Sequence, residues 1–336
     1  MRMNDFSKSL HDFFTIYLTA QRGISDNTVK NYRDTFVQLI MFMKEEKHIR
    51  ADKIEISNLD RATVNEYLEY LETQKKVSIS TRNNRLAGIK SYFRYISYHY
   101  PVHIGQCSTI FEIQSKKAES RPVDYLSVQA VQTLLQTLNQ NNKKDLRRLC
   151  IIGLLYESGA RVSELAMIKT FEIRLTDPCT LTLHGKGRKT RIIPIAQSIC
   201  GFIEKYIKEY SINSEGYLFV NSHNEKLTRE GIAYILKQSV EQARKKEPLL
   251  FPADISPHSL RHSKAMHLLE NGVSLIYIKD ILGHSSVTTT EIYSKANPEV
   301  KRKHIEQASD HIIDSLNKDY SEGDEKILLS WLKSNL

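Results

Sequence analysis

Two short motifs of histidine and arginine have the spacing of a site that binds an anion. In the first, residues 256–262 read Ser-Pro-His-Ser-Leu-Arg-His. A serine followed by a proline is typical of a helix N-terminus, with Ser256 as the cap. His258 and Arg261 then share one face of that helix, where backbone N–H groups and the helix dipole attract negative charge. The motif predicts a phosphate site, and a solvated helix face is the alternative.

The second motif follows an apolar helix predicted over residues 146–158. Residues 159–165 read Gly-Ala-Arg-Val-Ser-Glu-Leu, so Gly159 can end that helix and Arg161 lies on the turn before the next one. Arginine is suited to forked hydrogen bonds with phosphate oxygens. Glu164 is placed to cap the next helix or to brace a neighbouring group. A purely structural Arg–Glu pair is the alternative.

A basic β-turn is predicted between two alternating segments, residues 181–184 and 193–195. Its cations lie within six positions: Lys186, Arg188, Lys189 and Arg191. Its glycines do not match the phosphate loop GxxxxGK followed by Ser or Thr, which disfavours ATP binding. A turn that enters a DNA groove is the better interpretation, and a solvated turn is the alternative. Pro194 predicts that the second strand is a sheet edge.

Residues 282–293 add a histidine and a tyrosine. Gly283 is expected to end a helix, and His284 follows at that end. The Ser/Thr run after it is expected to begin a new helix that carries Tyr293.

The histidines also suggest a zinc site, built from His258, His262 and His267. The sequence has no HExxH pattern here, and Arg261 would repel a cation beside His258. We therefore expect no metal and no other cofactor.

The elements that must position these residues are mainly helical. Apolar stripes over residues 7–100 predict about four helices and no strand, and Ser25 is a plausible cap for one of them. Three basic side chains on the remaining surface are candidate DNA contacts: Arg82, Arg85 and Lys90. Polar residues 114–122 end in proline and predict an interdomain linker. With the hairpin, these segments predict a mainly α class with a small β-sheet.

Composition indicates a soluble globular chain of about two domains, with 336 residues, 40% of them apolar, and a formal charge of +9. The net charge is +5 over residues 1–122, +5 over 123–300 and −1 over 301–336. A basic excess on two segments is typical of two bodies that hold a polyanion, and a basic enzyme with another substrate is the alternative. The longest apolar run, residues 150–156, is too short to span a membrane. Four separated cysteines favour a reducing compartment, and we expect a cytoplasmic, nucleoid-associated bacterial protein.

The order of these motifs resembles that of the tyrosine recombinase, or phage integrase, family. Six positions carry the resemblance, in order and at family-like intervals: Arg161, Lys186, His258, Arg261, His284 and Tyr293. Each is weak alone, but six together are specific. The resemblance is strong over about residues 120–300 and extends to residues 7–112 by helical pattern only.

The resemblance implies a C-shaped clamp on double-stranded DNA. A helical, SAM-like core-binding domain would span residues 1–113, and the catalytic domain would span residues 123–300, after the linker. The tail, residues 301–336, would pass to the neighbouring subunit of a homotetramer on paired recombination sites, with docking on its own domain as the alternative. The resemblance also allows a partner recombinase. We expect no association with a membrane.

The resemblance further implies that Tyr293 attacks a DNA phosphate and stores the bond energy as a 3′-phosphotyrosyl link, without metal or ATP. Arg161 and Arg261 would neutralise the phosphate oxygens. His284 would hydrogen-bond one of these oxygens, and Glu164 would orient the active-site side chains.

Proton transfer would fall to two further residues. His258 would be the general base toward the tyrosine, and Lys186 would protonate the departing 5′-oxygen. Two rounds of cleavage and ligation would recombine two duplexes through a Holliday junction.

The subtype rests on weaker signals. About 110 residues precede the linker, which favours a two-domain recombinase without an arm-site domain. Residues 262–267 and 288–293 favour integration or transposition of a mobile element over Xer-like dimer resolution. A type IB topoisomerase, which relaxes supercoils as a monomer, shares this chemistry. A DNA-binding accessory protein on an inactive scaffold is disfavoured by the six intact positions.

Overall fold

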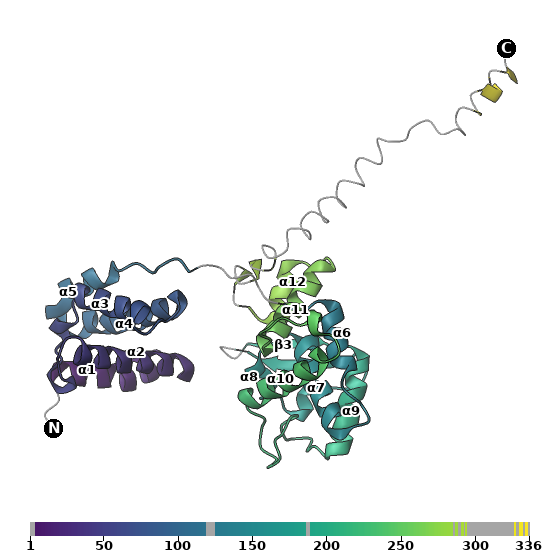
Figure 1. The fold of residues 1–336 in the computed structure, drawn as a ribbon, viewed down its shortest axis with the longest axis horizontal. Helices are drawn as coiled ribbons and strands as arrows, with labels where there is room; N and C mark the ends of the chain where they lie inside the picture. The colour runs from purple at the N-terminus through teal and green to yellow at the C-terminus, as the bar shows by residue number, and fades with distance from the viewer. Residues whose placement is uncertain are drawn as a thin grey trace. The chain divides into compact units, whose positions relative to one another are not determined.

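The computed structural model describes residues 4–118, 125–185 and 189–284, together with residues 286, 287, 290, 291, 293, 326, 329–331, 333 and 334. The chain divides into two compact units, residues 1–120 and 121–336, which we call unit 1 and unit 2 (Figure 1). The division falls inside the predicted linker, of which residues 114–118 are described and form neither helix nor strand.

Among the described residues of unit 1, all regular secondary structure is helical. Its helices are α1 (Asp5–Asp12), which continues into a π-helix (Phe13–Gln21), α2 (Asp26–Glu45), α3 (Arg61–Thr73), α4 (Ile79–His99) and α5 (Ile104–Phe111). Single 3-10 turns lie at Ala51–Lys53, Ile56–Asn58 and Pro101–His103. The helical pattern predicted over residues 7–100 is confirmed. Ser25 precedes α2 as predicted, but its hydroxyl contacts Thr28 Oγ1 at 3.0 Å and makes no cap bond to the backbone.

Aromatic rings fill much of the core of unit 1. The ring centroid of Phe13 lies 6.1 Å from that of Phe36 in α2 and 5.5 Å from that of Tyr92 in α4. All three side chains are buried, and each such ring contributes about 1.5–3 kcal/mol to folding. The hydroxyl of Tyr92 lies 2.7 Å from Ser9 Oγ, so its polar end is satisfied.

Unit 2 places one apolar helix at its centre. Its helices are α6 (Val128–Gln136), α7 (Lys143–Ser158), α8 (Val162–Leu165), α9 (Gln197–Tyr210), α10 (Arg229–Arg244), α11 (Pro257–Glu270) and α12 (Leu275–Leu282), with 3-10 turns at Thr170–Glu172 and Pro248–Leu250. α7 packs against α6, α9, α10 and α11, which explains why residues 149–155 are apolar on every side. Ser127 and Ser256 cap α6 and α11, and Pro257 opens α11, as predicted.

The sheet of unit 2 is antiparallel, in the order β1 (Ile173–Arg174), β2 (Thr180–His184) and β3 (Thr190–Pro194). β2 and β3 form the predicted hairpin, with Leu181 opposite Ile193. β3 is an edge strand, as Pro194 predicted. β1 was not predicted, because two residues are too few to show alternation.

Two helices of unit 2 end at glycines in the left-handed region. Gly159 ends α7 with φ +56°, and Gly283 ends α12 with φ +65°. A Cβ at Gly159 would lie 2.8 Å from Leu282 Cδ2, so the two helix ends meet too closely for a side chain. Both predicted helix ends are confirmed, and their meeting point is where the candidate site lies.

Candidate active site

Three arginines from three different elements converge on the C-terminus of α12. Arg191 Nε donates to the carbonyl of Ile281 at 2.9 Å, Arg261 Nη2 to that of Leu282 at 2.7 Å, and Arg161 Nη2 to that of Gly283 at 3.1 Å. The last carbonyls of a helix have no partner within it and form the negative end of its dipole. This helix end therefore collects positive charge.

Arg261 is the most enclosed of the three. Only 1% of it is exposed, and its Nη1 also donates to the carbonyl of Gly159 at 2.7 Å. Its guanidinium thus bridges the ends of α7 and α12. Burial, assisted by the charge of Arg161, lowers the pKa of Arg261 to about 10, so it remains charged at neutral pH.

Glu164 joins the other two arginines. Its carboxylate accepts from the backbone N–H of Arg161 at 2.8 Å, from Arg161 Nη1 at 2.8 Å and from Arg191 Nη2 at 2.7 Å. Burial acts to raise the pKa of Glu164, but the hydrogen bonds from Arg191 and Arg161 outweigh it and hold that pKa below its ordinary value. Glu164 therefore both caps α8 and braces the site, the two arrangements considered from its sequence position.

Tyr293 lies among histidines and is fully buried, with 0% exposed. Its hydroxyl oxygen is 2.8 Å from His262 Nδ1. The ring of His284 lies nearly parallel to that of Tyr293, at 12° and 6.5 Å between centroids, and its Nδ1 is 3.0 Å from Thr290 Oγ1. His258 is exposed, and its ring centroid is 4.4 Å from that of His262.

The surroundings keep these groups uncharged. Burial, with the positive charges nearby, lowers the pKa of His262 and of His284 to about 4, and partial desolvation also lowers that of His258. Burial raises the pKa of Tyr293 to about 12, although Arg261 opposes this. At neutral pH the site therefore holds neutral imidazoles and a protonated phenol beside a cluster of guanidinium groups.

The structure thus brings together five of the six predicted positions, with Glu164 beside them. Lys186 and Arg188 lie outside the described residues. Lys189 is exposed on the hairpin. Arg191 points inward, with its side chain 12% exposed, and its contact with DNA stays a prediction.

Sequence reasoning missed two parts of this site. His262 was weighed only as a metal ligand, although its position one helical turn after His258 was a signal that it shares the same face. Arg191 was counted with the turn cations. Its position opposite Leu183 in the hairpin, whose side chain is buried, was the available signal.

The basic side chains predicted to contact DNA from unit 1 make contacts within that unit. Arg82 is 5% exposed and its Nε lies 3.3 Å from a carboxylate oxygen of Glu72. Arg85 Nη1 donates to the carbonyl of Asn31 at 2.9 Å, and Lys90 Nζ to that of Phe111 at 2.8 Å. DNA contact by these three residues stays a prediction.

The zinc hypothesis receives no support from the geometry. His267 Nδ1 is 2.8 Å from the hydroxyl of Tyr156 and belongs to a different contact from His262. Across the described ranges, no three His, Cys, Asp or Glu side chains are grouped so as to hold a metal ion. Nor does any helix in those ranges combine the length and apolar character needed to cross a membrane.

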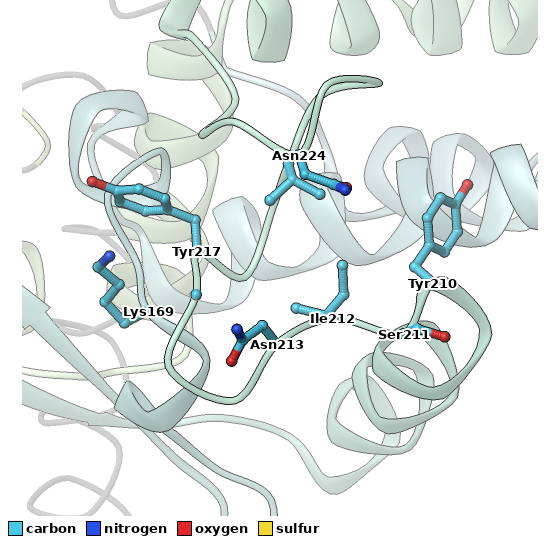
Figure 2. Close-up of a pocket in the computed structure, with 9 residues that line it drawn as sticks. Lys169, Tyr210, Ser211, Ile212, Asn213, Tyr217 and Asn224 are labelled. Carbon is cyan, nitrogen blue, oxygen red and sulfur yellow. The ribbon is translucent and has the colours of Figure 1, made fainter.

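A pocket of about 560 Å³ lies elsewhere in unit 2 (Figure 2). Its walls come mainly from the end of α9 and the following loop, and Lys169 Nζ lies 3.6 Å from the ring centroid of Tyr217 there. None of the site residues above lines it. Of the predicted tail, only residues 326, 329–331, 333 and 334 are described, and these are helical and exposed.

Family models match both units. The phage integrase family matches residues 124–299, and the N-terminal SAM-like domain of phage integrases matches residues 10–100. The integrase/recombinase homologue y4rC of Sinorhizobium fredii is 31% identical over 300 residues, covering 89% of this chain and 90% of its own. The tyrosine recombinase XerD of Oceanobacillus iheyensis is 33% identical over 293 residues, covering 85% and 93%.

Two solved structures share the fold. The Tn1549 transposon integrase in complex with transposon right end DNA matches with a TM-score of 0.68 and 18% identity, covering 89% of this chain and 98% of that one. The XerH site-specific recombinase bound to difH substrate, in a post-cleavage complex, matches with a TM-score of 0.66 and 19% identity, covering 86% and 81%.

Proposed function

Because the chain belongs to the phage integrase family and is a tyrosine-type site-specific DNA recombinase, we propose that it cuts and rejoins double-stranded DNA through a 3′-phosphotyrosyl intermediate on Tyr293. The observation that carries this proposal is the position of the Tyr293 hydroxyl, 2.8 Å from His262 Nδ1 and close enough to Arg261 for the guanidinium charge to act on it.

In the proposed step, the oxygen of Tyr293 forms a bond to the phosphorus, and the bond to the 5′-oxygen of the next nucleotide breaks. The phenol proton leaves to a base, and the 5′-oxygen gains a proton, for which Lys186 is the proposed donor. Ligation is the same step in reverse, with the 5′-hydroxyl of another strand.

Positive charge stabilises the phosphate as its oxygens gain negative charge in this step. Arg161 suits this role because its side chain is 35% exposed while Glu164 fixes its direction. Each terminal nitrogen of Arg261 carries a second N–H besides the one given to a carbonyl, so this guanidinium can also donate to a phosphate oxygen. His284 is proposed as a further donor.

The burial of Tyr293 sets a condition on the reaction. A side chain with 0% exposed can meet a DNA phosphate only after residues that cover it move aside. We therefore infer that binding of DNA uncovers the Tyr293 hydroxyl before cleavage, while this hydroxyl keeps its contact with His262 Nδ1. This separates DNA binding, which does not need the tyrosine, from chemistry, which does.

The substrate is proposed to be a pair of recombination sites held by four copies of the chain. The DNA strands are exchanged through a Holliday junction, and the tail of each copy passes to its neighbour. Similarity to y4rC and to the Tn1549 integrase favours integration or transposition of a mobile element. The XerD relatives favour the second candidate, Xer-like resolution of dimers, with or without a partner recombinase.

The first test traps the intermediate. The full chain is incubated with nicked duplexes of randomised sequence, whose cleaved strand diffuses away, and the DNA in SDS-resistant adducts is sequenced. We expect adducts on a defined sequence that persist in excess EDTA. Tyr293→Phe should bind the recovered duplex with unchanged affinity and form no adduct, because it lacks the attacking oxygen.

Tyr277→Phe is the matched control, because Tyr277 is an exposed tyrosine on α12, and it should form adducts at the wild-type rate. Adducts of undiminished yield with Tyr293→Phe would overturn the proposal. Loss of adducts in EDTA that Mg²⁺ or Zn²⁺ restores would revive the metal hypothesis. Relaxation of supercoils at single sites, without strand exchange, would instead indicate a topoisomerase.

A further inference from the structure

Two histidines one turn apart on α11 face the proposed nucleophile differently. His262 Nδ1 lies 2.8 Å from the hydroxyl oxygen of Tyr293. His258, the residue expected to be the base, contacts the ring of His262 at 4.4 Å between centroids. Among the described residues, no hydrogen bond joins His258 to Tyr293. The nitrogen that touches the reacting oxygen therefore belongs to His262.

The protonation states allow this contact to carry a proton. His262 is neutral at neutral pH, because burial and then the nearby charges lower its pKa to about 4. With its own proton on Nε2, a neutral imidazole accepts at Nδ1. The phenol is protonated, because burial raises the pKa of Tyr293 to about 12.

These two values oppose a complete proton transfer in the chain without DNA. A bound phosphodiester changes the balance, because its negative charge favours an imidazolium and counters the effect of the arginines. The phenol also becomes a stronger acid as its oxygen bonds to phosphorus. Transfer is therefore expected during the attack and not before it.

We propose that His262 is a catalytic residue that accepts the proton of Tyr293 through Nδ1 as the tyrosine oxygen attacks the DNA phosphate. The proton moves from the phenol oxygen to Nδ1, and the electron pair left on the oxygen forms the bond to phosphorus. In ligation the same nitrogen returns the proton to the departing phenol. This inference rests on the proposed function, because it names the base of the same reaction.

The same helix supplies a matched control. His267 Nδ1 lies 2.8 Å from the hydroxyl of Tyr156, the same kind of pair at the same distance. Both histidines belong to α11 and both bonds are partly buried. His267 and Tyr156 are not part of the arginine cluster. If cleavage slows only because a His–Tyr hydrogen bond to α11 is broken, the loss should appear in variants of both histidines. If cleavage slows because proton transfer is lost, the loss should appear only at His262.

The experiment uses the full chain and the duplex recovered from the adduct selection. His262→Asn places an amide near the position of Nδ1, which can hydrogen-bond the phenol but cannot take its proton. His262→Ala removes both functions. We expect both variants to bind the duplex and to lose about 10²–10⁴-fold in adduct formation rate, the usual contribution of a general base. His267→Asn should cleave within about threefold of the wild type, since it leaves proton transfer intact.

A second arm replaces Tyr293 by 3,5-difluorotyrosine, whose phenol loses its proton more readily. If His262 accepts that proton, the ratio of the adduct formation rates of wild type and His262→Asn should fall at least tenfold, because a more acidic phenol depends less on a base. We call this ratio the gap. A role in packing or orientation would leave the gap unchanged. His258→Asn serves as the comparison and should keep its gap.

Each outcome decides the inference. Cleavage by His262→Asn within about threefold of wild type overturns it, and faster cleavage would mean that the contact only restrains the tyrosine. If fluorotyrosine does not reduce the gap, His262 only packs against or orients Tyr293 and does not take its proton. A gap that closes for His258→Asn instead restores His258 as the base. Absence of adducts with the wild type contradicts the proposed function itself, and is thereby distinguished from failure of this inference.

Discussion

Each unit of the chain buries an arginine, and the partners of the two differ. Arg82 of unit 1 is paired with the carboxylate of Glu72, which Lys116 Nζ also contacts at 2.8 Å. Arg261 of unit 2 bridges two carbonyls, those of Gly159 and Leu282. The first charge is paired directly with an opposite charge. The second is bonded to the partial charges of two helix ends, and the carboxylate of Glu164 acts on it without an ion-pair contact.

This difference separates a structural arginine from one that is prepared for an added anion. A guanidinium paired with a carboxylate offers less attraction to an added anion. Arg161 is an intermediate case, because its partner Glu164 is shared with Arg191. A guanidinium held by carbonyls is fixed in direction but keeps its formal charge, so a phosphate placed beside it is stabilised without rearrangement. Burying a charge without an ion-pair partner lowers the stability of the fold, and such a loss is expected at a site where the reaction uses that charge.

The largest expected effect of this contrast is on cleavage. Arg261→Met should slow adduct formation about 10²–10³-fold at saturating DNA, the loss typical of removing one charge-stabilising donor. Arg82→Met should act on the stability of unit 1 or on DNA affinity, because its partner is a carboxylate of that unit. The rates are measured on the recovered duplex over a range of DNA concentrations. A similar loss for both variants at saturation would contradict the contrast.

The next effect is on stability. Glu164→Gln leaves Arg161 and Arg191 without a negative partner, and we expect a loss of about 2–3 kcal/mol in the free energy of unfolding of unit 2. This is below the full range for a buried pair, because solvent screens Arg161. Glu72→Gln in unit 1 should cost less, since Glu72 is more exposed. Urea unfolding followed by circular dichroism and by hydrogen exchange of each unit gives both free energies. An equal loss for the two variants would contradict the predicted difference.

The smallest effect concerns pH. The pKa of His262 and of His284 in the folded chain is about 4, below the ordinary 6.5. The unfolded chain therefore binds more protons between these values, and the stability that these neutral imidazoles contribute is present above pH 6.5 and is lost as the pH falls toward 4. Exchange of α11 amides, corrected for intrinsic rates, should rise on acidification more than that of α4. In His284→Asn this rise should be smaller, and an identical rise would refute the assignment.

The local elements of the site could be predicted from the sequence because each depends on near neighbours. Ser256 and Pro257 begin a helix, Gly159 and Gly283 end helices, and the alternation around the basic turn gives a hairpin. Motif order then identified the family.

The partners of the side chains could not be predicted, because they depend on where separate elements meet. Pairing in the hairpin places Arg191 on the face of the buried Leu183, but it does not show that the guanidinium reaches Glu164 and the end of α12. The choice between His258 and His262 likewise required the position of Tyr293 relative to α11. Both belong to tertiary packing, which the pattern of a single helix does not contain.

The glycine that ends α12 restricts how this site can change in evolution. Gly283 has a backbone conformation that side chains disfavour, and a Cβ there would also lie 2.9 Å from Arg191 Nη1. Shortening Arg191 would remove the collision but not the backbone strain, which asparagine tolerates better than most residues with a side chain. A lineage that keeps three arginines on this helix end is therefore expected to keep glycine, or one of the few residues that accept a positive φ, at position 283.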